Sequence, residues 1–100
     1  MNAVERAIVK RLVEFMLARG WLTRWQEPGG QAATLDVIEK IEETGMAWIR
    51  FSREGVRAGS VLLIEGNGED IVSDWTIPAD GAFGADMDAF LNELDRAVAS

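Results

Sequence analysis

Apolar residues recur every three or four positions in three stretches of the chain, residues 3–19, 34–44 and 86–98. This is the period of an amphipathic helix, with one apolar side for a core and one polar side for solvent. Gly20 and Gly45 follow the first two stretches, at a place where glycine commonly ends a helix. The sequence therefore predicts three helices. The apolar side of the first comprises Val4, Ile8, Leu12, Phe15 and Met16.

Three strands are predicted between the second and third helices. Residues 46–52 alternate between two faces, as a half-buried strand does, and residues 60–65 and 70–76 are rich in strand-forming residues. Asn67 and Gly68 separate the last two runs, and an Asn-Gly pair is the strongest short-range signal of a tight β-hairpin. Within the middle run, residues 61–64 have no polar face, which predicts a central strand covered on both sides. The two faces of the first strand are Ala47, Ile49 and Phe51, and Met46, Trp48 and Arg50.

These elements predict a single α+β domain over residues 1–100. Its helices pack on a three-stranded antiparallel β-meander, in the order α-α-β-β-β-α. Trp21 and Trp25 bound a short segment that is either an edge strand or an ordered loop, and residues 28–30 form a break after it. Two tryptophans this close either cap a small core or form an exposed anchor for a partner.

The sequence contains no histidine, cysteine or tyrosine. This removes the most common general base, thiol nucleophiles, disulfides and zinc sites built from thiolate or imidazole. A non-enzymatic protein without metal or cofactor is therefore expected. No apolar run approaches the ~20 residues that cross a bilayer, and the first residues lack the order of a signal peptide. A cytoplasmic protein without membrane contact is the corresponding expectation.

The charge is −7 overall and is unevenly distributed. Residues 1–25 carry five Lys and Arg against two acids, and Arg6, Lys10 and Arg11 form a candidate basic face on the first helix. Residues 65–95 carry nine acids and no Lys or Arg. The overall sign disfavours general nucleic-acid binding, which needs cations to displace counterions. The two regions can instead meet different partners, or each other in a homo-oligomer.

Asp70 and Asp74 are the most suitable pair of carboxylates for acid–base chemistry. Four residues along a strand span ~13 Å, whereas paired glycosidase carboxylates lie about 5–9.5 Å apart. A structural role is therefore favoured for both residues. Asp70 is expected to hydrogen-bond with the hairpin backbone, and Asp74 to accept an N–H or to pair with Arg50 on the same sheet.

Residues 66–75 read Gly-Asn-Gly-Glu-Asp-Ile-Val-Ser-Asp-Trp. They resemble a Gly-Asn-(Asp/Gly)-x-Asp-Val-Ile-(Ser/Ala)-Asp-(Tyr/Trp) signature found in a group of small proteins from phages, prophages and mobile elements of proteobacteria. The arginine-glycine turn and apolar strand of residues 57–64 and the helix over 34–41 are similar as well. Ser60 departs from the expected tryptophan, and the Ile-Val pair is in reversed order. The group has no established activity, so the resemblance implies a mobile-element context and no catalytic residue.

The sequence favours an accessory protein that acts by binding another protein. Trp48 and Trp75 are candidates for its contact surface if one face of the sheet is left uncovered. One alternative is an acidic mimic of nucleic acid, in which residues 65–95 occupy a basic groove of a host protein. Two others are nucleic-acid binding through the basic first helix, and a carboxylate-based enzyme with two acids within about 10 Å in a pocket.

Overall fold

The computed structural model describes residues 1–23 and 33–99, which form three α-helices and one four-stranded antiparallel sheet. Each strand pairs with its neighbour along the chain, so the sheet order is β1-β2-β3-β4. The predicted α+β class is confirmed. The elements are α1 (Ala3–Ala18), β1 (Leu22–Thr23), α2 (Ala33–Thr44), β2 (Met46–Ser52), β3 (Gly59–Ile64), the 3₁₀ turn η1 (Gly68–Asp70), β4 (Val72–Trp75) and α3 (Ala82–Ala99).

The prediction of a three-stranded sheet is wrong by one strand, because β1 adds to its edge. This two-residue strand pairs antiparallel with the last two residues of β2. Of the two alternatives for the segment, the edge strand is the one that forms. Trp21, directly before it, is fully buried and belongs to the core. Trp25 and the predicted break at residues 28–30 lie outside the described residues.

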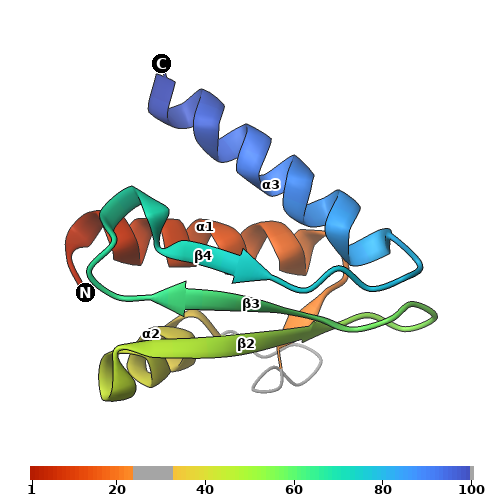
Figure 1. Ribbon diagram of the computed structural model, residues 1–100, viewed down its shortest axis with the longest axis horizontal. Helices are drawn as coiled ribbons and strands as arrows, with labels where there is room; N and C mark the ends of the chain where they lie inside the picture. The colour runs from red at the N-terminus through yellow and green to blue at the C-terminus, as the bar shows by residue number, and fades with distance from the viewer. Residues whose placement is uncertain (24–32, 100) are drawn as a thin grey trace.

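One face of the sheet packs against α1 and α2, which lie behind it in Figure 1. The alternation of β2 sends Ala47, Ile49 and Phe51 to this face, as predicted, and Val61 and Leu63 of β3 join them in the core. The described helices leave the other face, turned toward the viewer, uncovered (Figure 1). The prediction that β3 is covered on both sides is therefore wrong, since alternate residues of β3 are only half-buried.

A capping box fixes the start of α1. The Asn2 side chain accepts a hydrogen bond from the Glu5 backbone N–H (2.9 Å), and the Glu5 carboxylate accepts one from the Asn2 N–H (3.2 Å). This turns Glu5 toward the core and rotates the buried side of the helix away from the predicted one. Val4 is exposed, and the buried residues are Glu5, Ile8, Val9, Leu12, Val13 and Met16.

The Glu5 carboxylate also holds the connection between β3 and β4. It accepts hydrogen bonds from the backbone N–H groups of Gly66 (2.7 Å) and Gly68 (3.1 Å), and the residue is only 1% exposed. Burial by itself raises the pKa of Glu5. The backbone donors and the N-terminal ammonium outweigh burial and hold this pKa below its ordinary value of 4.5. One buried carboxylate thus joins the start of α1 to the loop before β4.

Replacing Glu5 with glutamine is expected to destabilise the fold at neutral pH, because an amide NH₂ would then face backbone donors. Since the pKa of the folded state is lowered, the carboxylate stabilises the fold above pH 4.5, and this stabilisation is lost as the pH falls through the lowered pKa. Melting temperatures of wild type and Glu5→Gln should differ by several degrees near neutrality and converge as the pH falls below 4.5 and through the lowered pKa of Glu5. Glu14→Gln, at an exposed position of α1, is the control. A difference that stays constant with pH would contradict this role of Glu5.

The connection between β3 and β4 is longer than the predicted one, which spans residues 66–69. Strand β3 ends at Ile64 and β4 begins at Val72, with η1 between them. Asn67 has a φ of −93°, whereas a tight Asn-Gly turn requires positive φ at both central residues. The N–H groups of the flanking glycines are instead held by α1. The antiparallel pairing of β3 with β4 is therefore confirmed, and the predicted turn is wrong.

A β-bulge decides which side chains of β4 face the core. Asp74 pairs with Leu62, and Val72 pairs with the next residue of β3, which leaves Ser73 as the extra residue of the bulge. Val72 and Trp75 consequently both pack against the core, although their odd spacing would place them on opposite faces of a regular strand. Asp74 lies on the uncovered face.

The last helix begins at Ala82 rather than at the predicted position near Asp86. Asp80 accepts hydrogen bonds from the Arg57 N–H (2.7 Å) and the Ala82 N–H (3.3 Å), so it ties the start of α3 to the loop between β2 and β3. The Arg57 N–H is the largest cause that holds the pKa of Asp80 below its ordinary value of 3.8.

Aromatic packing anchors the first turn of α3. The Phe83 ring packs edge-on against Trp21 (5.4 Å between centroids) and tilted against Phe51 (6.4 Å). All three side chains are buried. The Phe83 ring also lies directly on the backbone of Gly59, where an added Cβ would approach it to 2.2 Å. We call the three rings the aromatic cluster. Together with Gly59 they close one end of the core.

Asp86 lies beside the aromatic cluster and joins the ends of α1 and β2 to α3. Its carboxylate accepts a hydrogen bond from Trp21 Nε1 (2.7 Å) and pairs with Arg19 and Arg53, each at 3.3 Å. The Arg53 guanidinium also lies over the Trp21 ring, 4.5 Å from its centroid. The side chain of Asp86 is only 15% exposed, so its role is to complete the core.

Candidate interaction surface

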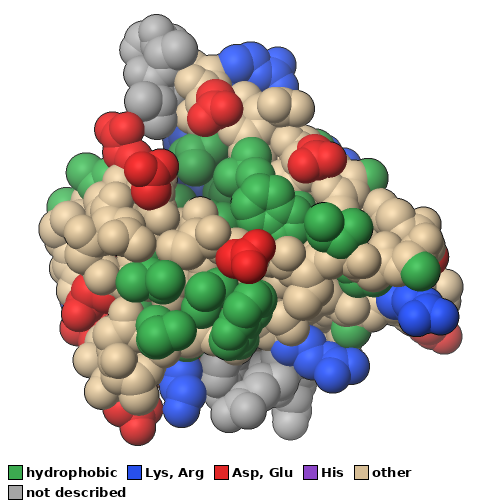
Figure 2. All heavy atoms as spheres, viewed as in Figure 1, with side chains coloured by type: hydrophobic (Ala, Val, Ile, Leu, Met, Phe, Trp, Pro, Cys, Tyr) green, Lys and Arg blue, Asp and Glu red, His purple; other side chains and the backbone are tan. Residues whose placement is uncertain are grey.

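The uncovered face of the sheet carries neighbouring apolar side chains. Met46 and Trp48 of β2 are 47% and 51% exposed there, and Leu62 and Ile64 of β3 are half-buried. The register pairs Trp48 with Leu62 and Met46 with Ile64, so the four side chains form one group. Figure 2 shows apolar side chains gathered over this face. We call these four residues the open-face patch.

A cation and an anion flank the open-face patch. Asp74 of β4 lies beside Leu62 of β3. Arg50 lies on the same face of β2, two residues after Trp48. The Asp74 carboxylate accepts the backbone N–H of the next residue (2.8 Å), which is one of its two predicted contacts. Within the described residues, no ion pair joins Arg50 or Asp74 to another charge. Both charges are therefore available to a partner.

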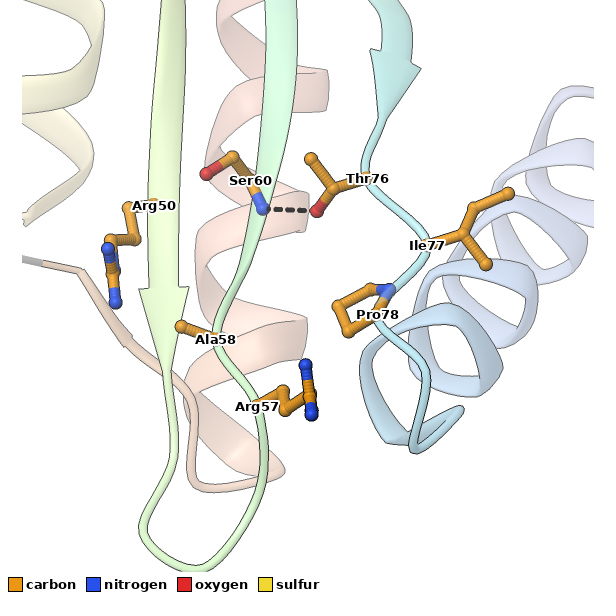
Figure 3. A pocket seen from close by; sticks show the side chains of 7 residues that line it. All are labelled: Arg50, Arg57, Ala58, Ser60, Thr76, Ile77 and Pro78. Carbon is orange, nitrogen blue, oxygen red and sulfur yellow. Dashed lines mark hydrogen bonds between the residues drawn. The ribbon is translucent and has the colours of Figure 1, made fainter.

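A shallow pocket of about 430 Å³ opens at one end of this face, where β2, β3 and the loop after β4 meet. Figure 3 shows Arg57 and Pro78 on its two sides, whereas the Arg50 side chain extends from β2 away from the other labelled residues. Its floor is closed by the hydrogen bond from the Ser60 N–H to Thr76 Oγ1 (2.9 Å). The two guanidinium groups make this the positively charged end of the face, suited to a carboxylate.

The structure brings together three of the predicted surface residues and separates the other two. Trp48, Arg50 and Asp74 share the open face. Trp75 is half-buried against the core, so it lies on the other side of the sheet from Trp48. Asp70 lies in η1 rather than on β4, and it hydrogen-bonds through its backbone. The two aspartates therefore do not share a strand face.

Three residues of this surface, Leu62, Ile64 and Arg57, were not predicted from the sequence. The apolar run of β3 does not alternate, so nothing local shows which of its residues face outward. Arg57 lies in a turn, and it lines the pocket only because the loop after β4 folds back beside it. The positions of all three residues on this surface therefore depend on the tertiary fold.

The predicted basic face of α1 is divided by acids. Arg6 pairs with Glu42 of α2 at 2.7 Å. Arg11 lines a second pocket, between α1 and α3, together with Glu93. Lys10 is exposed between them. The neighbouring carboxylates lower the positive potential of this helix, which leaves nucleic-acid binding through it with little support.

The nine acids of residues 65–95 have different roles. Asp80 and Asp86 make the contacts described above, and Glu65 pairs with the N-terminal ammonium at 3.0 Å. The others are exposed and lie on three different elements, η1, β4 and α3: Glu69, Asp70, Asp74, Asp88, Glu93 and Asp95.

Comparison with known proteins finds no matching family model, no matching curated protein and no matching solved structure. None of the helices in the described residues is long and apolar enough to span a membrane. The chemistry of the surface follows from its own residues. It offers an indole and aliphatic side chains for apolar contact, with a guanidinium and a carboxylate beside them for directional pairing.

Proposed function

We propose that this chain is a non-enzymatic interaction protein that binds another protein through the open-face patch. The observation that carries the proposal is the exposure of Trp48, beside Leu62, on the sheet face that the described helices leave uncovered. Tryptophan is among the residues that contribute most to binding when a partner buries it. Contiguous apolar surface left in water is a common mark of such a contact site.

The form of the surface also supports protein binding. The open-face patch lies on the broad face of a sheet, and the pocket beside it is shallow. Protein interfaces have this organisation, with an apolar centre and a polar rim. Arg50 and Asp74 stand where that rim would be.

The resemblance of residues 66–75 to mobile-element proteins suggests the setting. We infer an accessory protein of a phage or mobile element that acts on a host or phage protein. An acidic mimic of nucleic acid has less support, because its acids are divided among structural contacts and three elements. Salt separates the two mechanisms, since electrostatic mimicry weakens steeply with ionic strength and apolar contact does not.

The test is affinity capture from a lysate of the host cells with tagged wild type and Trp48→Ser, washed in parallel at low and high salt. We expect wild type to retain a protein at both salt concentrations. Trp48→Ser should retain at least tenfold less of it, because a tryptophan that a partner buries is typically worth about 2 kcal/mol or more in an interface. Mass spectrometry of the eluates measures the loss.

Leu17→Ser is the matched control. Leu17 is also an exposed apolar residue, 41% exposed, but it lies on α1, away from the open face. This variant should retain the same protein as wild type, and circular dichroism should show all three proteins folded. Retention that survives Trp48→Ser, or that is lost with Leu17→Ser as well, would contradict the proposed surface.

A further inference from the structure

We propose that the open-face patch binds a second copy of this chain, so that two sheets pack face to face around a two-fold axis. This inference rests on the proposed function, because it uses the same open-face patch. A two-fold interface is self-complementary, because residue i of one copy meets residue j of the other and residue j meets residue i. The open face meets this condition, since it carries both a cation and an anion without an ion-pair partner in the described residues.

The register gives the positions of these charges. Trp48, Leu62 and Asp74 form one row across β2, β3 and β4, and Arg50 lies in the next row, beside Ser60. With strands ~4.8 Å apart and ~3.4 Å per residue, Arg50 and Asp74 lie ~12 Å apart on a diagonal across the face. The midpoint of that diagonal falls between Leu62 and Ser60, at the margin of the open-face patch.

Consider a two-fold axis that lies between the two sheets and parallel to them. It passes over that midpoint and is perpendicular to the diagonal, and rotation about it brings the opposite charges of the two copies together. Arg50 of each copy then faces Asp74 of the other, and both ion pairs form at once. The same rotation places Trp48 of each copy over Leu62 of the other, so the half-exposed indole is covered. Asp74 thereby reaches the margin of the pocket lined by Arg50 and Arg57.

Charge arrangement favours a second copy over a different protein. A surface that binds a different protein through opposite charge generally carries charges of one sign, as in complexes whose association is electrostatically steered. This face has one charge of each sign, at positions that one rotation exchanges. The area is small, so we expect a weak dimer that forms at high protein concentration.

Charge reversal tests the arrangement. We expect sedimentation velocity of wild type, up to about 1 mM, to show a monomer–dimer equilibrium. Arg50→Asp alone and Asp74→Arg alone should each weaken dimerisation by at least about tenfold, because each creates two like-charge contacts. An equimolar mixture of the two variants should dimerise again. In that mixture, the aspartate introduced at position 50 faces the arginine introduced at position 74, and the native pair forms on the other side.

Arg96→Asp and Asp88→Arg are the controls, since they change the net charge by the same amounts at exposed positions of α3. They should dimerise as wild type does. A wild type that stays monomeric up to about 1 mM, a dimer unaffected by the reversals, or a mixture that does not recover would each overturn the second-copy proposal.

Failure of this inference is distinguishable from failure of the proposed function. A monomeric wild type from which Trp48→Ser still removes a captured protein would leave the open-face patch as a binding surface for that other protein. A dimer that mixing restores would identify the second copy, whatever the capture retains.

Discussion

Gly59→Ala is expected to destabilise the protein by about 2–3 kcal/mol, although it adds a single methyl group. The added Cβ would lie 2.2 Å from Cγ and Cδ2 of Phe83 and 2.5 Å from its Cε2. The ring cannot simply move away, because Trp21 and Phe51 pack against it. For a domain that is typically stable by 5–15 kcal/mol, this is a large fraction of the total. Urea denaturation, monitored by circular dichroism, measures the effect.

A double-mutant cycle with Phe83→Ala identifies the contact that causes it. Phe83→Ala alone should cost about 3–5 kcal/mol, because it empties a buried aromatic site. In that background Gly59→Ala should cost little, since no ring opposes the added methyl group, and the two effects should be clearly non-additive. Gly84→Ala is the control. Gly84 lies in α3 with nothing within 4 Å of an added Cβ, so this change should be neutral or stabilising by up to about 1 kcal/mol. Additive effects of the pair would show that the cost has another origin.

Periodicity predicted the elements whose form depends on local pattern. The helices over α1 and α2 and the alternation of β2 are all written in nearby residues, so Trp48 and Arg50 were correctly placed on the face opposite Phe51. The capping box of Asn2 and Glu5 also has a sequence signal, because Asn is followed three positions later by Glu. That signal indicates that Glu5 turns back toward Asn2, which agrees with the buried side that α1 has.

The predictions that failed depend on contacts between distant parts of the chain. The Asn-Gly pair does not form a tight turn, because Glu5, more than sixty positions earlier, takes the N–H groups of Gly66 and Gly68. The bulge at Ser73 turns Trp75 into the core, and a one-residue shift of that kind leaves no local mark. The start of α3 at Ala82 likewise depends on Asp80 and on the packing of Phe83 against other elements.

For the candidate surface, the sequence therefore predicted the residues that β2 contributes, and it included Asp74 of β4. It missed Leu62 and Ile64 of β3, and it included Trp75, which packs against the core. A strand of consecutive apolar residues assigns no face by itself. The outward position of Leu62 follows from pairing with Trp48 on one side and Asp74 on the other. The open-face patch is therefore determined by the register of the strands and not by their composition.

Asp86→Ala is the second change with a large expected effect, a loss of about 2–3 kcal/mol. The greater part arises from the Trp21 indole N–H, which would be left buried without its acceptor. Loss of the ion pairs with the partly exposed Arg19 and Arg53 adds less than about 1 kcal/mol each, and the better helix propensity of alanine offsets roughly half a kcal/mol. Asp86→Asn, which keeps a carbonyl oxygen for the indole, should cost less than half as much.

Two measurements separate this explanation from a general loss of charge on α3. Denaturant unfolding should rank the variants as wild type, Asp86→Asn and Asp86→Ala in decreasing stability, with the exposed Asp88→Ala within about 0.5 kcal/mol of wild type. The Trp21 indole N–H resonance, which reports its 2.7 Å hydrogen bond to the carboxylate, should shift strongly in Asp86→Ala and stay in place in Asp88→Ala. If Asp88→Ala proved as destabilising as Asp86→Ala, charge rather than the buried indole would be the cause. In that case the link from α3 to the core would reside in its buried apolar side chains, which are Phe83, Met87, Phe90 and Leu94.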